Sequence, residues 1–121
     1  MAQITLHGDK INTSGNLPNV GDAAANFDLV RNDLSKVNLD NFKGQKVVLN
    51  IFPSIDTSVC ATSTRVFNKR ASEMENTKVF NISKDLPFAH KRFCGAEGIE
   101  NVEGLSQYKD FNFSTNYQVD I

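Results

Sequence analysis

The chain has 121 residues, which is the length of one domain with a modest hydrophobic core, so we treat 1–121 as a single domain. Hydrophobic residues make up 40% and charged residues 22%, as in ordinary globular proteins. The net charge of −1 gives no electrostatic basis for binding nucleic acid or a membrane surface, and no stretch is long enough to span a membrane. The N-terminus lacks the pattern of a secretory signal, so we expect a cytoplasmic protein.

The N-terminal part of the chain predicts short strands joined by turns. Gln3 to Leu6 and Ile11 to Thr13 flank the turn residues 7–10, which include Gly8-Asp9, and this pattern predicts a β-hairpin. Ser14 to Asn26 contains glycines and a proline and predicts a loop. The next predicted elements are two strands and one helical turn closed by glycine, at residues 27–30, 36–39 and 40–44.

A strand followed by a helix forms the centre of the chain. Residues 47–52 (VVLNIF) are a nearly continuous apolar run, which is typical of a strand buried on both faces. Pro53 ends this strand because proline has no N–H to donate to a neighbour. In the helix that follows, these residues recur at the spacing of a core-facing stripe: Val59, Ser63, Val66, Phe67 and Met74. Cys60 then lies in the first turn of that helix.

A second strand is predicted at residues 77–82. Together with residues 47–52 and the helix between them it makes a βαβ unit, so the two strands are expected to be parallel. Shorter elements complete an α/β fold: a strand at 102–105 and a weak helix at 108–117.

Another helix is predicted to begin at Pro87, which is tolerated in a first helical turn. Asp85 is its predicted cap, and the glycines at 95 and 98 are expected to end it. Phe88 and Phe93 are interpreted as core residues of this helix.

The position of Cys60 favours its thiolate. The first N–H groups of a helix have no partners within the helix and together carry roughly half a positive charge. Because the thiolate is the nucleophilic form of cysteine, Cys60 is a candidate reactive residue. Thr57 lies three residues earlier, where its hydroxyl can cap the helix or face a molecule that approaches the sulfur. The structural alternatives are an inert buried Cys60, a plain cap at Thr57 and a simple strand terminator at Pro53.

Cys94 is the second cysteine and lies near the predicted C-terminal end of its helix, where the dipole does not favour a thiolate. In a reducing compartment, a lone pair of cysteines is more often catalytic, redox-active or metal-binding than structural. We therefore interpret Cys60 as the first to react and Cys94 as its partner, with a packed core cysteine at 94 as the alternative. His90 and Cys94 have the spacing of metal ligands, but two cysteines and one histidine leave zinc one ligand short, so we expect neither metal nor cofactor.

The chain resembles the bacterial thiol peroxidases of the atypical two-cysteine peroxiredoxin family. Pro53, Thr57 and Cys60 match the peroxiredoxin pattern P-x-x-x-T-x-x-C within the string PSIDTSVC. Three further segments are similar to family segments, with Ala25 standing where proline is common: VGDAAANFDL (20–29), FKGQKVVLNIFP (42–53) and SKDLPFAHKRFCGAEG (83–98).

The resemblance implies a thioredoxin-like fold with an N-terminal hairpin, and a homodimer. It implies reduction of hydrogen peroxide and alkyl hydroperoxides in antioxidant defence, with thioredoxin as the reductant. Carried over to this chain, Cys60 is the peroxidatic cysteine and Cys94 the resolving cysteine, while Thr57 contacts the peroxide and Pro53 shields the site. A disulfide needs Cα atoms within about 7 Å, so we predict that the segments around both cysteines unwind locally during turnover.

In the family, the active-site arginine lies in a later strand, beyond Ile121, and we expect this chain to lack that strand, the other closing strands and the last helix. Arg65 and Arg92 lie in different motifs, so the role is carried over to neither. Removing one preorganised donor of this kind typically costs about 10²–10³ in rate. The alternative to a peroxidase is therefore a non-catalytic thioredoxin-like module or an inactive fragment.

Overall fold

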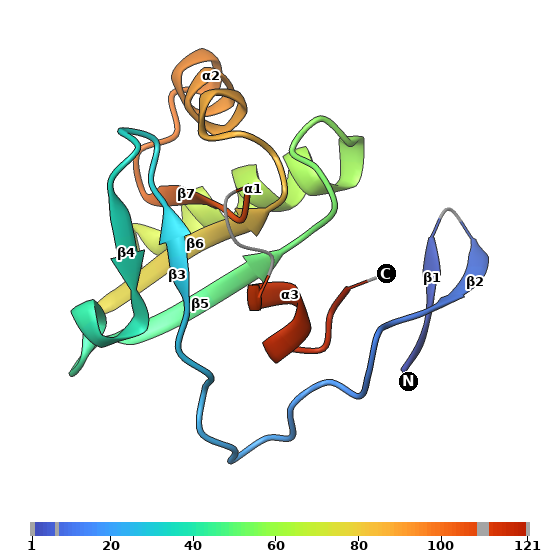
Figure 1. The fold of residues 1–121 in the computed structure, drawn as a ribbon. Helices are drawn as coiled ribbons and strands as arrows, with labels where there is room; N and C mark the ends of the chain where they lie inside the picture. Colours follow the sequence, from blue (N-terminus) through green and yellow to red (C-terminus); the bar gives the residue numbers. More distant parts are fainter. Residues whose placement is uncertain (1, 7, 109–111, 121) are drawn as a thin grey trace.

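The computed structural model, drawn in Figure 1, describes these parts of the chain: residues 2–6, 8–108 and 112–120. Strands β1 (Gln3–Leu6) and β2 (Asp9–Asn12) form a small antiparallel hairpin, separate from the main sheet. Gly8 has a φ of 83° in the turn, a conformation that glycine adopts without steric cost. The predicted hairpin is confirmed, and His7 of the predicted turn lies outside the described residues.

The main sheet has five strands in the spatial order β4-β3-β7-β6-β5. Their bounds are Asp28–Val30 (β3), Lys36–Asn38 (β4), Lys46–Ile51 (β5), Thr77–Ser83 (β6) and Val102–Ser106 (β7). Strands β5, β6 and β7 are parallel, with Val79 of β6 beside Val48 on one side and Val102 on the other. Strand β3 runs antiparallel to β4 and β7. Because helix α1 (Ser58–Ala71) joins β5 to β6, the predicted βαβ unit is confirmed.

Helices pack on both faces of this sheet. Helices α1 and α2 (Pro87–Glu97) lie on one face, where Phe93 packs in a cluster with Val79. The short helix α3 (Asn112–Asn116) lies on the other face, in front of the sheet in Figure 1, and its side chains join a cluster that contains Phe80. Neighbouring residues of a strand point to opposite faces, so β6 contributes to both clusters. None of the helices among the described residues has the length and apolar character needed to cross a membrane.

The connections before the βαβ unit also follow the prediction. Residues 14–26 contain no helix or strand. The helical turn predicted at 40–44 is a 3-10 turn, η1 (Leu39–Phe42), and Gly44 follows it with a φ of 84°.

One prediction about β5 is wrong. This strand was expected to be buried on both faces, but its residues are exposed or only partly buried, and it is an edge strand of the sheet formed by the described residues. The strand that is buried on both faces is β6, where the five residues from Val79 to Ser83 are all buried. An apolar run predicts a strand, but its position in the sheet depends on its neighbours, which the run itself does not specify.

The predicted inner face of α1 is also partly wrong. Val59 and Val66 were expected to face the core but are 77% and 51% exposed. The helix instead buries Cys60, Ala61 and Thr64, which the apolar pattern did not select because two of them are small or polar. Thr64 is buried with a hydrogen bond to the sheet, which it accepts from Asn81.

Three predictions about α2 need correction. Asp85 does not cap the helix, because the N-cap residue is Leu86, which makes no side-chain hydrogen bond. The Asp85 carboxylate instead accepts the N–H of Ile55 in the loop before α1. Gly95 lies inside the helix, and only Gly98, with a φ of 66°, ends it. Phe88 is 61% exposed and is not a core residue, because it lies on the face of α2 that points away from the sheet.

Candidate active site

The carboxyl ends of the three parallel strands meet at one edge of the sheet. Ligands of open α/β sheets bind outside this edge, so it is the first place to look for a site. The chain leaves β5 through Phe52, whose N–H donates to the Ile82 carbonyl of β6 at 3.1 Å. It leaves β7 through Gln107, whose N–H donates to the Ser83 carbonyl at 3.0 Å. Hydrogen bonds therefore join the ends of all three parallel strands at this edge.

Cys60 is the third residue of α1, in its first turn, as predicted. Its thiol is free, and the residue is 9% exposed. It borders an open cavity of about 770 Å³ together with Pro53 and Thr57. The walls of this cavity include apolar side chains of the hairpin and of the C-terminal segment, among them Leu6 and Val119. Cys60 is therefore buried beside a space that admits a small oxidant.

A polar network lies beneath the turn that carries Cys60. The Cys60 carbonyl accepts hydrogen bonds from Ser63 Oγ at 2.9 Å and Thr64 Oγ1 at 3.0 Å. Asn81 Nδ2 of β6 donates to Thr64 Oγ1 at 2.8 Å, and Asn50 Nδ2 of β5 donates to Ser63 Oγ at 3.3 Å and to Asn81 Oδ1 at 3.0 Å. Thr64 and Asn81 are almost fully buried, so these bonds fix the turn to the sheet without competition from water.

Sequence reasoning missed these two asparagines. Each interrupts an apolar strand, and the structure places Asn50 and Asn81 at paired positions of the parallel register. A polar residue at equivalent positions of two adjacent strands is a signal that an alignment of β5 with β6 would have revealed.

Thr57 is the N-cap residue of α1 by its backbone, but its side chain makes no capping bond. Its hydroxyl donates to the Ser54 carbonyl at 2.8 Å, and its N–H donates to the same carbonyl at 3.2 Å. Of the two roles predicted for this hydroxyl, capping is therefore wrong. The side chain lies in the wall of the cavity beside Cys60 and Pro53, which is exposed.

Asp85 binds the loop before α1. Its Oδ2 accepts the Ile55 N–H at 2.7 Å and its Oδ1 accepts the Ser54 hydroxyl at 2.8 Å. The Ser83 hydroxyl is 2.7 Å from Oδ2 and 2.9 Å from His90 Nε2. Burial lowers the pKa of His90, with the Asp85 charge opposing the shift, so this ring is neutral near pH 7.

Cys94 lies in a different environment. It is a free thiol near the C-terminal end of α2, partly buried against an apolar cluster whose buried members are Val79, Ile99 and Val102. Burial raises the pKa of the Cys94 thiol, so less of it is ionised than of an exposed cysteine. Cys94 does not line the cavity beside Cys60, and the structure leaves the two thiols unbonded.

Arg65 and Arg92 both form ion pairs: Arg65 with α2, and Arg92 with the loop before α1. Arg92 Nη2 of α2 lies 2.7 Å from Asp56 Oδ1, and Arg65 Nη2 of α1 lies 2.5 Å from Glu97 Oε1. Arg65 also lies over the ring of Phe93 at 5.7 Å. Neither arginine lines the cavity beside Cys60.

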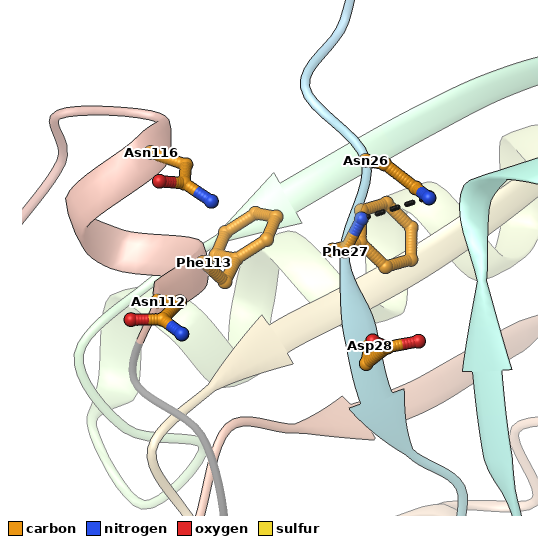
Figure 2. Close-up of a pocket in the computed structure, with 6 residues that line it drawn as sticks. All are labelled: Asn26, Phe27, Asp28, Asn112, Phe113 and Asn116. Atoms are coloured by element: carbon orange, nitrogen blue, oxygen red, sulfur yellow. Dashed lines mark hydrogen bonds between the residues drawn. The ribbon is translucent and has the colours of Figure 1, made fainter.

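A second, smaller hollow of about 190 Å³ lies between α3 and the start of β3, and Figure 2 shows the residues that line it. The rings of Phe27 and Phe113 pack edge to face, with their centroids 5.7 Å apart. Asn26 Oδ1 accepts the Phe27 N–H at 2.9 Å. Among the described residues, those that line it include no thiol, histidine or cation. Within the described part of the chain, no group of three or more histidine, cysteine or acidic residues is arranged to hold a metal.

Known proteins with similar sequences and structures identify the family. Residues 19–121 match the model of the Redoxin family. The chain is 55% identical over its whole length to the thiol peroxidase of Mycobacterium bovis and spans 72% of that protein. It is 34% identical to a peroxiredoxin-like protein from Aquifex aeolicus. The crystal structure of that protein superposes with a TM-score of 0.84, and the match covers 96% of this chain and 67% of the Aquifex chain.

The thiol peroxidase from Chromobacterium violaceum is only 19% identical but has the same fold, with a TM-score of 0.86 over 96% of this chain and 67% of that one. The predicted thioredoxin-like α/β fold is thus confirmed. The chain belongs to the Redoxin family, in its group of bacterial thiol peroxidases.

Proposed function

We propose that the chain reduces hydroperoxides through a sulfenic acid on Cys60. The Cys60 thiolate attacks the terminal peroxide oxygen, the O–O bond breaks, and Cys60 gains the OH group as a sulfenic acid. The hydroxide or alkoxide that is expelled takes up the proton that the Cys60 thiol released on ionisation, and it leaves as water or an alcohol. The sulfur is oxidised by two electrons and the peroxide is reduced by two. The observation that carries this proposal is the placement of Cys60, in the first turn of a helix and beside an open cavity.

The same cavity supports the choice of substrates. Thr57 and Pro53 line the same cavity as Cys60, which supports a contact between the Thr57 hydroxyl and the peroxide and a role of the Pro53 ring in limiting access of water. The apolar walls, which include Leu6 and Val119, accommodate the organic part of an alkyl hydroperoxide as well as hydrogen peroxide.

Cys94 completes the cycle as the resolving residue. Its thiol sulfur attacks the Cys60 sulfur, an S–S bond forms, and the sulfenic oxygen leaves as water. The two thiols lie in separate surroundings, so the reaction requires the first turn of α1 and the end of α2 to open. Both cysteines are free thiols in this structure, which is the state that begins the cycle.

An external dithiol then reduces the disulfide by exchange, and we assign this role to a thioredoxin. Family membership supports the assignment, and it supports a homodimer acting in the cytoplasm.

The test is a peroxidase assay coupled to thioredoxin and its reductase. The parent chain is expected to consume peroxide over many turnovers, and Cys60→Ser is expected to abolish consumption. Cys94→Ser is expected to react with one equivalent of peroxide and then stop, because its sulfenic acid has no partner. Consumption that survives in folded Cys60→Ser would overturn the proposal, and a parent chain that consumes no peroxide would indicate a non-catalytic module.

A further inference from the structure

We propose that Asp85 is a positioning residue that holds the loop before α1 (residues 52–57) against the start of α2. The segments that carry the two cysteines are then fixed together and released together. The proposal deepens the proposed function and rests on it. Asp85 follows β6, whereas the loop that it binds follows β5, so the contact joins segments about 30 residues apart in the chain.

The loop side of this contact leads directly to the site. Both carboxylate oxygens are used, since Oδ2 accepts the Ile55 N–H at 2.7 Å and Oδ1 accepts the Ser54 hydroxyl at 2.8 Å. Ile55 is 1% exposed, which anchors the loop in the protein. The carbonyl of the same Ser54 accepts the Thr57 hydroxyl at 2.8 Å. Asp85 therefore sets, through Ser54, the position of Thr57, which lines the cavity beside Cys60.

The other side of the contact leads to α2. The Ser83 hydroxyl has one proton, which it donates to Asp85 Oδ2, so it accepts a hydrogen bond from His90 Nε2 at 2.9 Å. His90 lies in α2 and is 1% exposed. The Asp85 carbonyl also accepts the hydroxyl of Ser106 at the end of β7. Asp85 is thus linked through its carboxylate to the loop before α1 and to Ser83 at the end of β6, through Ser83 to α2, and through its main-chain carbonyl to the end of β7.

An aspartate suits this position because its side chain meets three donors. The Ile55 N–H and the hydroxyls of Ser54 and Ser83 all donate to this side chain, and a carboxylate accepts on both oxygens. Asparagine has nearly the same shape but replaces one acceptor with an NH₂ donor. Asp85→Asn is therefore a nearly isosteric change that removes the negative charge and one acceptor, so that the Ser54 hydroxyl, which donates to Oδ1 in the parent, loses its acceptor there.

The test measures two rate constants by stopped flow. Oxidation of Cys60 by hydrogen peroxide is followed in Cys94→Ser chains with and without Asp85→Asn, and disulfide formation is followed in chains that keep both cysteines. Asp85→Asn is expected to slow oxidation about tenfold, because the site loses its fixed geometry. The same change is expected to accelerate disulfide formation several-fold, because α2 and the loop separate more easily. A merely structural role would not move the two steps in opposite directions.

Asp33→Asn is the matched control. Asp33 Oδ1 also accepts an N–H and a hydroxyl, both from Ser35, at 2.9 and 2.6 Å, but it lies in an exposed turn between β3 and β4. Both rate constants of this control are expected to stay within about twofold of the parent values. The proposal is overturned if Asp85→Asn folds and both of its rate constants match those of Asp33→Asn.

Two further measurements keep the proposal separate from folding and from the proposed function. Ser54→Ala removes one of the three donors, and it is expected to slow oxidation in the same direction but by less, about twofold to threefold. Unchanged oxidation in Ser54→Ala, if Asp85→Asn does not fold, would also overturn the proposal. Hydrogen exchange of the Ile55 amide tests the contact without peroxide: faster exchange in Asp85→Asn supports it even if the parent fails as a peroxidase, and unchanged exchange refutes it.

Discussion

The two cysteines lie on helices that pack on the same face of the sheet, yet their surroundings differ in kind. The turn that carries Cys60 is held by directional hydrogen bonds from Asn50 and Asn81, through Ser63 and Thr64. Cys94 is held by apolar contact with a cluster that includes residues of α1, β6 and β7, and by a helix end. Hydrogen bonds fix a geometry, whereas apolar contacts exclude water without fixing an angle.

This difference suits the two roles proposed for the cysteines. A nucleophile needs one orientation relative to its substrate, and misplacement is costly in rate. A resolving thiol must leave its site and travel, and an apolar cluster at the edge of a helix can release it without stranding a buried polar group. The following variants perturb these two surroundings in turn.

Gly104→Ala is expected to have the largest effect, on the Cys94 side. A Cβ at Gly104 of β7 would lie 2.6 Å from His90 Cβ, so α2 must move away from the sheet. We expect the free energy of unfolding to fall by about 3 kcal/mol, as for an overpacked core. In a Cys60→Ser background, Cys94 should react faster with iodoacetamide, since the burial that raises its pKa is relaxed.

Gly95→Ala is the matched control for this change. A Cβ at Gly95 meets nothing within 4 Å, and the residue lies inside α2. We expect a gain of about 0.5–1 kcal/mol in urea unfolding, because alanine favours a helix over glycine. Equal behaviour of the two variants would contradict the tight contact between β7 and α2.

Thr64→Val tests the Cys60 side and is expected to be the next largest. It keeps the shape of a residue that is fully buried but removes the hydroxyl, which leaves Asn81 Nδ2 without its acceptor at that position. An unsatisfied buried group of this kind costs about 1–2 kcal/mol, measured by urea unfolding. Thr62→Val, on the exposed face of the same helix, should change stability by less than about 0.5 kcal/mol. Thr64→Val with unaltered stability would show that the network does not hold this turn.

A smaller effect is expected from pH, through His90. Burial lowers the pKa of this ring in the folded chain, whereas in the unfolded chain it takes up a proton near pH 6.5. The unfolded state therefore binds more protons as the pH falls below about 6.5, and stability declines by up to about 1.4 kcal/mol per pH unit until the folded ring is protonated. The difference between parent and His90→Gln in urea unfolding at pH 7.5 and 5.5 measures this contribution. A difference that is the same at both pH values would contradict it.

Arg65→Gln is expected to have the smallest effect. Its ion pair with Glu97 joins α1 to α2 beside Cys94, but both side chains are substantially exposed, and such pairs contribute little to stability. Unfolding curves and the alkylation rate of Cys94 should both be unchanged within error. If Arg65→Gln exposed Cys94 as much as Gly104→Ala does, the ion pair and not the apolar packing would hold α2 in place.

The parts of the fold that depend on local patterns could be predicted from the sequence. The hairpin, the βαβ unit and the place of Cys60 in a first helical turn follow from apolar runs, turn residues and Pro53, and the structure has them. The position of β5 at the sheet edge depends on which strands pair with it, and a single apolar run carries no such information.

The errors near the site have the same origin. Asp85 stands two residues before a helix and therefore fits a cap, but its acceptors are used by Ser54 and Ile55, which are distant in the sequence. Asn50 and Asn81 matter only because the parallel register sets them side by side. Side chains whose role depends on a partner from another strand are not visible until the strands are aligned.

Peptide mass spectrometry after one equivalent of hydrogen peroxide tests the division of roles between the two thiols most directly. The reduced chain, oxidised and then blocked with an alkylating reagent, should yield one cross-linked pair of peptides, containing Cys60 and Cys94 and two hydrogens lighter than the separate thiols. In Cys94→Ser, Cys60 alone should carry the added oxygen. Oxidation that falls first on Cys94, or a Cys60 that remains fully alkylated after peroxide, would contradict the assignment of Cys60 as the reactive residue.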